Sequence, residues 1–213
     1  MFDNAYLFSI DDNGLVVKWG NMMFQVLTAT VFLVAAWLLQ LFVVFPIEQA
    51  LRPENSNASV FSYVFLPHGA KVLVAMFLMA WSFPVIFIVA FGSGIIFEYD
   101  PYYAFCGALL AAATAIMPIC LFNFVTNRPL NYSVFRYAGG NLNLFRASML
   151  LVVAVAFMNS AFQAALAKAI LDITPDPQLS LGFLVGDIIG GFVCVVGGIL
   201  FLRLFIRGGF NAL

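Results

Sequence analysis

Two charged side chains stand in parts of the sequence that are otherwise apolar. Lys71 lies in the apolar stretch 59–97, and Asp187 lies early in the predicted helix 179–206. A charge at the centre of a bilayer costs roughly 2.5–3.5 kcal/mol on insertion scales, so such residues are rarely accidental. Three interpretations stay open: an ion pair that fixes the register of two helices, a site for a ligand, a proton or a signal, or Lys71 alone extending its side chain toward the membrane surface.

The only histidine of the chain, His68, precedes Lys71 by about one helical turn. A lone histidine is more often a satisfied polar group than a ligand, but its titration near neutral pH makes it a candidate sensor. Pro67 and Gly69 flank it and should disturb the helix, which membrane proteins tolerate inside the protein or beside a cavity. Because Lys71 and Asp187 lie deep in helices that start on the same side, we expect the two to form a direct ion pair.

The composition indicates a protein that is covered mostly by lipid. Of 213 residues, 64% are hydrophobic and 9% are charged, whereas a soluble domain carries about 25% charged residues. The formal net charge of −1 argues against nucleic acid as a partner, because such proteins need clustered positive charge. The expected partners are therefore the lipid bilayer and another membrane or signalling protein.

The apolar stretches predict an all-α integral membrane protein with a bundle of about six transmembrane helices. A polar segment, 1–20, which should form either a β-hairpin or an irregular stretch on the membrane surface, precedes a single transmembrane domain, 21–207. A short tail, 208–213, follows it. No cleavable signal is evident, so the first helix should remain as an anchor. Pro46 should end the first helix and Pro118 should kink the fourth. The predicted helices span residues 21–45, 61–81, 83–97, 102–125, 144–171 and 179–206.

The charged residues between the helices predict the orientation of the bundle. Six spans would place six basic residues on the amino-terminal side, and Arg52 and Lys168 on the other. Since loops rich in Lys and Arg stay cytoplasmic, both termini should be cytoplasmic, in a bacterial inner membrane. The six basic residues are Lys18, Arg128, Arg136, Arg146, Arg203 and Arg207.

Small and polar residues indicate how the helices pack. Gly182, Gly186, Gly190, Cys194 and Gly198 recur every four residues and let another segment approach closely, within the chain or in a dimer. Asn159 and Ser160 are placed to hydrogen-bond across helices. No nucleotide-binding motif, metal-ligand cluster or catalytic constellation is evident, so we expect no catalytic residues, no bound metal and no cofactor, and a protein that is not an enzyme.

Two segments resemble a known family. The first reads Leu66-Pro67-His68-Gly69-Ala70-Lys71-Val72-Leu73, and the second reads Gly186-Asp187-Ile188-Ile189-Gly190. They resemble the Leu-Pro-x-Gly motif and the Gly-Asp-x-x-Gly pattern of the first class of bacterial membrane-associated sensor (MASE) domains, over residues 60–205. The resemblance implies an integral-membrane input module of the kind that usually precedes a histidine kinase or a cyclic-dinucleotide enzyme. No such output domain follows Leu213, so we expect this short form to act through a separate partner protein.

Two other classes remain open. Six short helices in about 200 residues also resemble the substrate-capturing subunits of energy-coupling-factor vitamin transporters. Those subunits commonly carry a stripe of small residues on their first helix, whereas bulky residues such as Phe32 and Trp37 occupy the first helix here. An accessory structural subunit of a larger membrane complex is the third class, and the 25 phenylalanines suit contact with lipid in any of the three.

Overall fold

The structure is a computed structural model, which describes residues 10–11, 14–15, 19–51, 62–127, 141–172 and 177–210. These residues are helical apart from connecting turns and one short antiparallel β-pair, β1 (Ile10–Asp11) with β2 (Gly14–Leu15). That pair lies within the predicted hairpin region. The other residues before position 19, most of the loop carrying Arg128 and Arg136, and the end of the tail lie outside the described residues.

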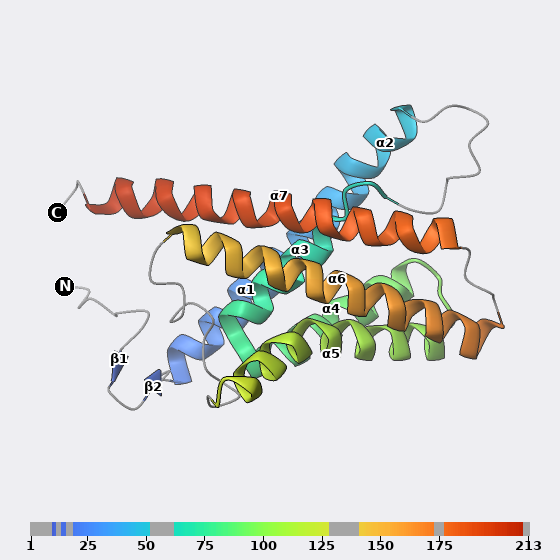
Figure 1. The fold of residues 1–213 in the computed structure, drawn as a ribbon. Coiled ribbons are helices and arrows are strands. Elements are labelled where there is room, and N and C mark those ends of the chain that lie inside the picture. The colour runs from blue at the N-terminus through green and yellow to red at the C-terminus, as the bar shows by residue number, and fades with distance from the viewer. Residues whose placement is uncertain are drawn as a thin grey trace.

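The helices follow one another along the chain, with the longest breaks between α2 and α3 and between α5 and α6 (Figure 1). The first group is α1 (Trp19–Leu39), the π-helical turn η1 (Gln40–Val44) and α2 (Phe45–Leu51). The second is α3 (Leu66–Leu78), the 3-10 turn η2 (Met79–Trp81) and α4 (Ser82–Ile96). Three long helices complete the fold: α5 (Pro101–Val125), α6 (Asn141–Leu171) and α7 (Pro177–Phe210).

Five helical stretches in the described residues are long and apolar enough to cross a membrane, where the sequence predicted six. They are Met23–Leu51, Leu66–Ile96, Pro101–Val125, Phe145–Ile170 and Ser180–Gly198. The difference lies in the second stretch, which joins the predicted second and third helices. Its two parts, α3 and α4, have 13 and 15 residues, or about 20 and 23 Å at 1.5 Å per residue. Each part alone is shorter than the roughly 30 Å of a hydrocarbon core.

The first helix does not end at Pro46, contrary to the prediction. The chain continues through Pro46 to Leu51 because a wider π-turn precedes the proline. In this turn the N–H of Phe45 donates to the carbonyl of Gln40, five residues earlier. A proline inside a helix lacks a donor and crowds the carbonyl four residues before it. The wider turn changes the spacing at this point, so the helix passes the proline. Pro118 likewise lies inside a continuous α5.

The predicted second helix begins later than expected. Residues Ser62–Phe65 are not helical, and α3 starts at Leu66 with Pro67 in its first turn. A proline is favoured there because the first N–H groups of a helix have no partner within the helix. Pro67 therefore starts this helix and does not disturb its interior.

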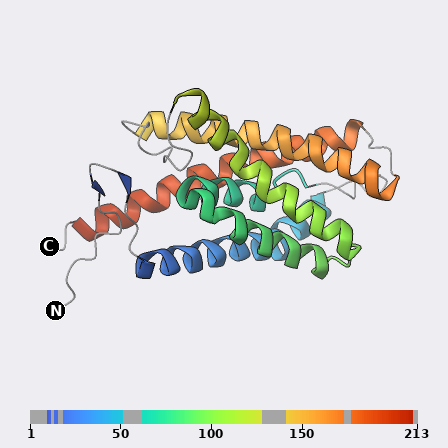
Figure 2. The same cartoon turned by 90° about the horizontal axis from the view of Figure 1, so that it is seen from below.

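The chain reverses direction after α3. Met79 ends the helix with a φ of 52°, a left-handed conformation that is unusual for a residue other than glycine. Figures 1 and 2 show α1, α4 and α6 running one way along the bundle and α3, α5 and α7 running the other way. As a result, α1 begins and α7 ends at the same end of the bundle.

The short helix α3 is the centre of the molecule. Every residue of α3 except Leu66 and Phe77 is buried, and α3 packs against α1, α4, α5, α6 and α7. A helix that is covered on all sides belongs to the core. The polar side chains of α3 therefore face other helices of the protein and not lipid.

Candidate functional site

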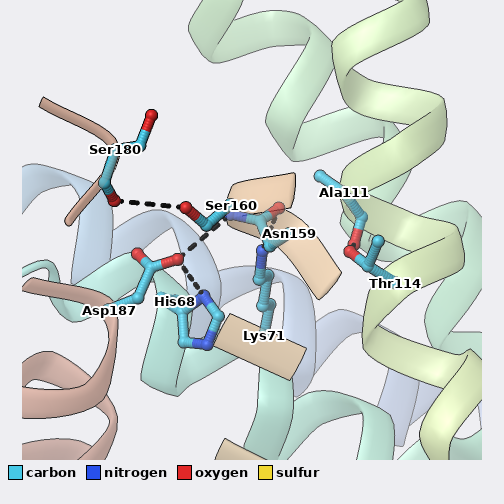
Figure 3. Close-up of polar contacts among 8 residues, drawn as sticks. All are labelled: His68, Lys71, Ala111, Thr114, Asn159, Ser160, Ser180 and Asp187. Atoms are coloured by element: carbon cyan, nitrogen blue, oxygen red, sulfur yellow. Dashed lines mark hydrogen bonds and ion pairs between the residues drawn. The ribbon is translucent and has the colours of Figure 1, made fainter. Parts of the chain in front are cut away.

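A chain of polar contacts links three helices at the centre of the bundle (Figure 3). The ammonium Nζ of Lys71 in α3 donates to Oδ1 of Asn159 in α6 at 3.0 Å. The amide Nδ2 of Asn159 donates to Oδ2 of Asp187 in α7 at 3.1 Å. The same Oδ2 lies 2.9 Å from Nδ1 of His68. We call these four residues, His68, Lys71, Asn159 and Asp187, the polar network.

Three of the four members of the network are buried, and Asn159 is half-buried. The exposed fraction is 0% for His68, 3% for Asp187 and 7% for Lys71. A buried charge needs a compensating charge and hydrogen bonds, because otherwise the loss of its hydration strongly destabilises the fold. Lys71 and Asp187 attract each other, and the amide of Asn159 offers an acceptor to the cation and a donor to the anion. Each charge is thereby compensated inside the protein.

The sequence predicted direct contact between Lys71 and Asp187, but the structure places Asn159 between them. Among the described residues, the only ion-pair contact of Asp187 within 4 Å is with His68. An amide can connect the two charges because it both donates and accepts. Ser160, the other polar residue expected to bond across helices, donates to the backbone carbonyl of Ser180 at 3.2 Å (Figure 3).

The imidazole of His68 is incompletely satisfied. Its contact with Asp187 has the distance of an ion pair, but neither ring nitrogen makes a hydrogen bond of good geometry with any described residue. The backbone carbonyl of Val152 in α6 is the acceptor beside the ring. A buried polar atom without a partner is costly and is worth explaining.

The non-helical segment Ser62–Phe65 holds the start of α3 in place. Inside a membrane, irregular backbone is tolerated only where protein satisfies its polar groups. The N–H of Val64 donates to Oε1 of Glu48 at 3.0 Å, and the N–H of Leu66 donates to Oε1 of Gln40 at 2.9 Å. Gln40 also donates through Nε2 to the hydroxyl of Ser62 at 2.9 Å. The end of the first span thus fixes the segment that leads to His68.

The glycines of α7 make room for the same segment. The N–H of Phe65 donates to the carbonyl of Gly186 at 2.9 Å. A Cβ at Gly186 would overlap the carbonyl oxygen of Ser62, and a Cβ at Gly190 would overlap the backbone of Phe65. The close approach expected for this ridge is therefore made by non-helical backbone and takes place within the chain.

Gly69 lies one turn further along the same contact. A Cβ at Gly69 would come within 2.6 Å of the Cβ of Cys194 and 2.7 Å of the carbonyl of Gly190. The thiol of Cys194 donates to the carbonyl of Leu66 at 3.3 Å. The two sequence motifs, 66–73 and 186–190, are thus brought into direct contact.

Sequence reasoning did not single out Gln40, Glu48 or Ser62. Gln40 carried a signal, because it is a polar residue between Leu39 and Leu41 in an apolar helix. It is fully buried. Within the residues that the structure describes, no three His, Cys, Asp or Glu side chains come together in a way that would hold a metal ion.

Comparison with protein-family models, curated proteins and solved structures finds no match to this chain. The fold itself defines the class. Five apolar helical stretches among the described residues, one of which contains the central buried helix α3, make the chain a multi-pass membrane protein in contact with the lipid bilayer. The polar network at its centre is the candidate functional site.

Proposed function

We propose that this chain is a sensory input module of the bacterial inner membrane that acts through a separate partner protein. The supporting observation is the contact between the segments 66–73 and 186–190, the two that resemble motifs of the first class of MASE domains. His68 and Asp187 come one from each segment, and Nδ1 of His68 lies 2.9 Å from Oδ2 of Asp187. Residues that matter only for lipid contact have no reason to meet in this way.

The polar network suits a sensory role because three polar contacts join the helices α3, α6 and α7. Intramembrane ionisable groups commonly mark ligand sites or proton relays. A change of charge or hydrogen bonding at the network acts on α3, α6 and α7 together. A movement of α6 or α7 would also displace the ends of these helices outside the bilayer, where a partner protein can bind.

The proposed orientation has six passes, with α3 and α4 counted separately, and both termini in the cytoplasm. The opposite directions of α3 and α4 support an even number of passes (Figures 1 and 2). The excess of basic residues on the amino-terminal side supports its cytoplasmic location. A partner on the cytoplasmic side would then meet the start of α1, the end of α7 and the loop between α5 and α6.

The test begins with mild-detergent purification from native membranes and mass spectrometry of the proteins that co-purify. We expect a signalling enzyme, such as a histidine kinase or a cyclic-dinucleotide enzyme. Its activity, measured with the chain in reconstituted membranes, should change when Lys71→Met and Asp187→Leu are combined. The control Lys168→Met, at an exposed position near the end of α6, should leave it unchanged. A large stoichiometric complex with no signalling enzyme would instead support an accessory subunit and would contradict the sensor.

A substrate-capturing transporter subunit is the second candidate. The short helix α3, which follows the non-helical segment Ser62–Phe65, favours it. Interrupted helices of this kind often form the substrate sites of transporters. Co-purification of an energy-coupling ATPase, together with retention of a small molecule by the purified chain, would favour this candidate over the sensor.

A further inference from the structure

The centre of the bundle holds one acid and two bases. The helices α1, α4 and α5 contain no Asp, Glu, Lys, Arg or His at all. In α6 the charged residues are Arg146 and Lys168, which stand 13 and 9 residues from Asn159, or about 20 and 14 Å along the helix. Besides Asp187, α7 carries Arg203 and Arg207 near its end. The thiol of Cys194 is the other ionisable group of α7 beside the start of α3, and it is hydrogen-bonded to Leu66.

One carboxylate therefore serves two basic groups. With Lys71 charged, Asp187 charged and His68 neutral, the network has no net charge. In that state Nδ1 must carry the proton of the ring, because an unprotonated Nδ1 would direct its lone pair at a carboxylate oxygen 2.9 Å away. The lone pair of the ring is then on Nε2.

The atom Nε2 is a buried acceptor that lacks a donor. It has no hydrogen-bond partner among the described residues. Because Nδ1 faces Asp187, Nε2 is the nitrogen available to the backbone carbonyl of Val152 beside the ring. Two acceptors facing each other do not bind, but a proton on Nε2 would turn this contact into an N–H donating to a carbonyl.

We propose that the polar network is a proton-binding site, and that the proton adds to Nε2 of His68. A hydronium ion supplies the proton: one O–H bond of the hydronium breaks, one N–H bond forms at Nε2, and a water molecule leaves. The bound proton makes His68 a cation that donates to Asp187 in α7 and to Val152 in α6. It also competes with Lys71 for the single carboxylate, through Asn159. The proposal deepens the sensor function and rests on it for its biological role, since it names the species that the site binds.

The chain allows a direct measurement, because His68 is its only histidine. Protein labelled with ¹⁵N in the imidazole and placed in lipid nanodiscs gives the nitrogen signals of this residue alone. A terminal affinity tag for such a sample must contain no histidine. Nitrogen shifts recorded between about pH 5 and 8, where histidine ordinarily titrates, distinguish a neutral ring from a doubly protonated one.

We expect the wild-type ring to be protonated on Nδ1 at the upper end of this range and doubly protonated at the lower end. At any one pH, Lys71→Met should have a larger doubly protonated fraction, because the carboxylate then serves one base. Asp187→Asn should have a smaller one. The control Lys168→Met should match the wild type.

A ring that stays neutral across the range in both the wild type and Lys71→Met would overturn the proposal. A titration that is identical in the wild type and Lys71→Met would overturn the competition for Asp187. Both tests compare only the wild type with Lys71→Met, so they can still be made if Asp187→Asn does not fold. The measurement needs no partner protein. If His68 titrates as expected but no signalling enzyme co-purifies with the chain, the sensor function is refuted and the proton-binding site is not.

Discussion

At the scale of single residues, the polar network is stable because its buried positive and negative charges compensate each other. Lys71 donates to Asn159, Asn159 donates to Asp187, and both charges are buried. Removing one member of a buried charge pair costs about 3–5 kcal/mol, because the other charge is left uncompensated, whereas removing both is often nearly neutral. Changes at these positions should therefore be strongly non-additive.

The first prediction follows from that compensation. Lys71→Met and Asp187→Leu should each lower the free energy of unfolding by about 3–5 kcal/mol, and the double variant should recover most of the loss. The fraction of monodisperse protein after heating in detergent, measured by size-exclusion chromatography, reports the effect. Lys168→Met is the matched control, since Lys168 is exposed. Losses that simply add in the double variant would show that the two charges are not coupled.

The second prediction concerns the bridging amide. Asn159→Leu leaves a buried ammonium without its acceptor and a carboxylate without a donor, at about 1–3 kcal/mol for each unsatisfied group. In a protein that already carries both neutral replacements at 71 and 187, the same change should cost much less. A double-mutant cycle on thermal stability measures this coupling. An equal cost in both backgrounds would mean that Asn159 acts through packing alone.

The sequence predicted the charged members of this network but not their connection. Lys71, Asp187 and His68 were evident because ionisable side chains are rare in apolar helices. The position of Asn159 between them depends on how α6 packs against α3 and α7. Hydropathy says that each helix is buried in lipid or protein, but not which neighbour each residue meets, so a direct pair was the simplest expectation.

At the scale of elements, the non-helical segment Ser62–Phe65 lies directly against the glycines of α7. The third prediction is that Gly190→Ala destabilises the protein by about 1–3 kcal/mol or more, because the new methyl group would overlap the backbone of Phe65, which cannot rotate away. Gly197→Ala in the same helix is the matched control. Nothing lies within 4 Å of its added Cβ, so it should be neutral or stabilising by about 0.5–1 kcal/mol. Thermal stability in detergent compares the two variants.

If Gly190→Ala proves as stable as Gly197→Ala, the segment does not lie against α7 as described. If Gly190→Ala instead weakens only the association of a dimer, so that the dimer dissociates at higher protein concentration, the small-residue ridge of α7 serves dimerisation.

The fourth prediction tests the support that the first span gives to this segment. Gln40→Leu removes the acceptor of the Leu66 N–H and the donor to Ser62, which should cost about 1–3 kcal/mol. Gln49→Leu, at an exposed position of α2, makes the same chemical change and should have little effect. Amide hydrogen exchange should also become faster at the start of α3 in Gln40→Leu only. Equal exchange in the two variants would remove Gln40 from this role.

Helix positions were largely predictable, and the failures have identifiable causes. The predicted helix 102–125 corresponds to α5 within one residue, because hydrophobic length and a proline-led start are local signals. The continuation through Pro46 depends on the π-turn before it, which the local sequence does not reveal. The late start of α3 was missed because residues 61–65 are as apolar as a helix, although the N–H groups of Val64 and Phe65 donate to Glu48 of α2 and Gly186 of α7.

At the scale of the whole molecule, the alternation of helix directions sets the fifth prediction. Reporter fusions after Gly20 and Asn211 should be cytoplasmic, and a fusion after Asn57 should lie on the opposite side. The reason is the common location of the start of α1 and the end of α7 (Figure 2), together with the excess of basic residues on that side. Reporters at 20 and 57 on the same side would contradict the topology. Reporters at 20 and 211 on opposite sides would mean an odd number of passes.

The division of the second apolar stretch into α3 and α4 was only partly visible in the sequence. Long apolar stretches are visible in any sequence, but the length of α3 and α4 depends on a reversal at Met79, which has no glycine or proline signal of its own. The predicted helices 61–81 and 83–97 already met at residue 82, and α4 does begin at Ser82, but α3 ends earlier than predicted, at Leu78.

The central position of α3 has a consequence for the synthesis of the chain. Its polar partners are encoded late: Asn159 follows Lys71 by 88 residues, and Asp187 follows His68 by 187 − 68 = 119 residues. At a synthesis rate of about 5–20 residues per second, α3 leaves the ribosome roughly 6–24 s before its last partner does. During that interval it is a short helix with an uncompensated ammonium and no covering helices on one side. The newly made chain must therefore keep α3 out of the lipid core, at the bilayer surface or against the insertion machinery, until α7 arrives.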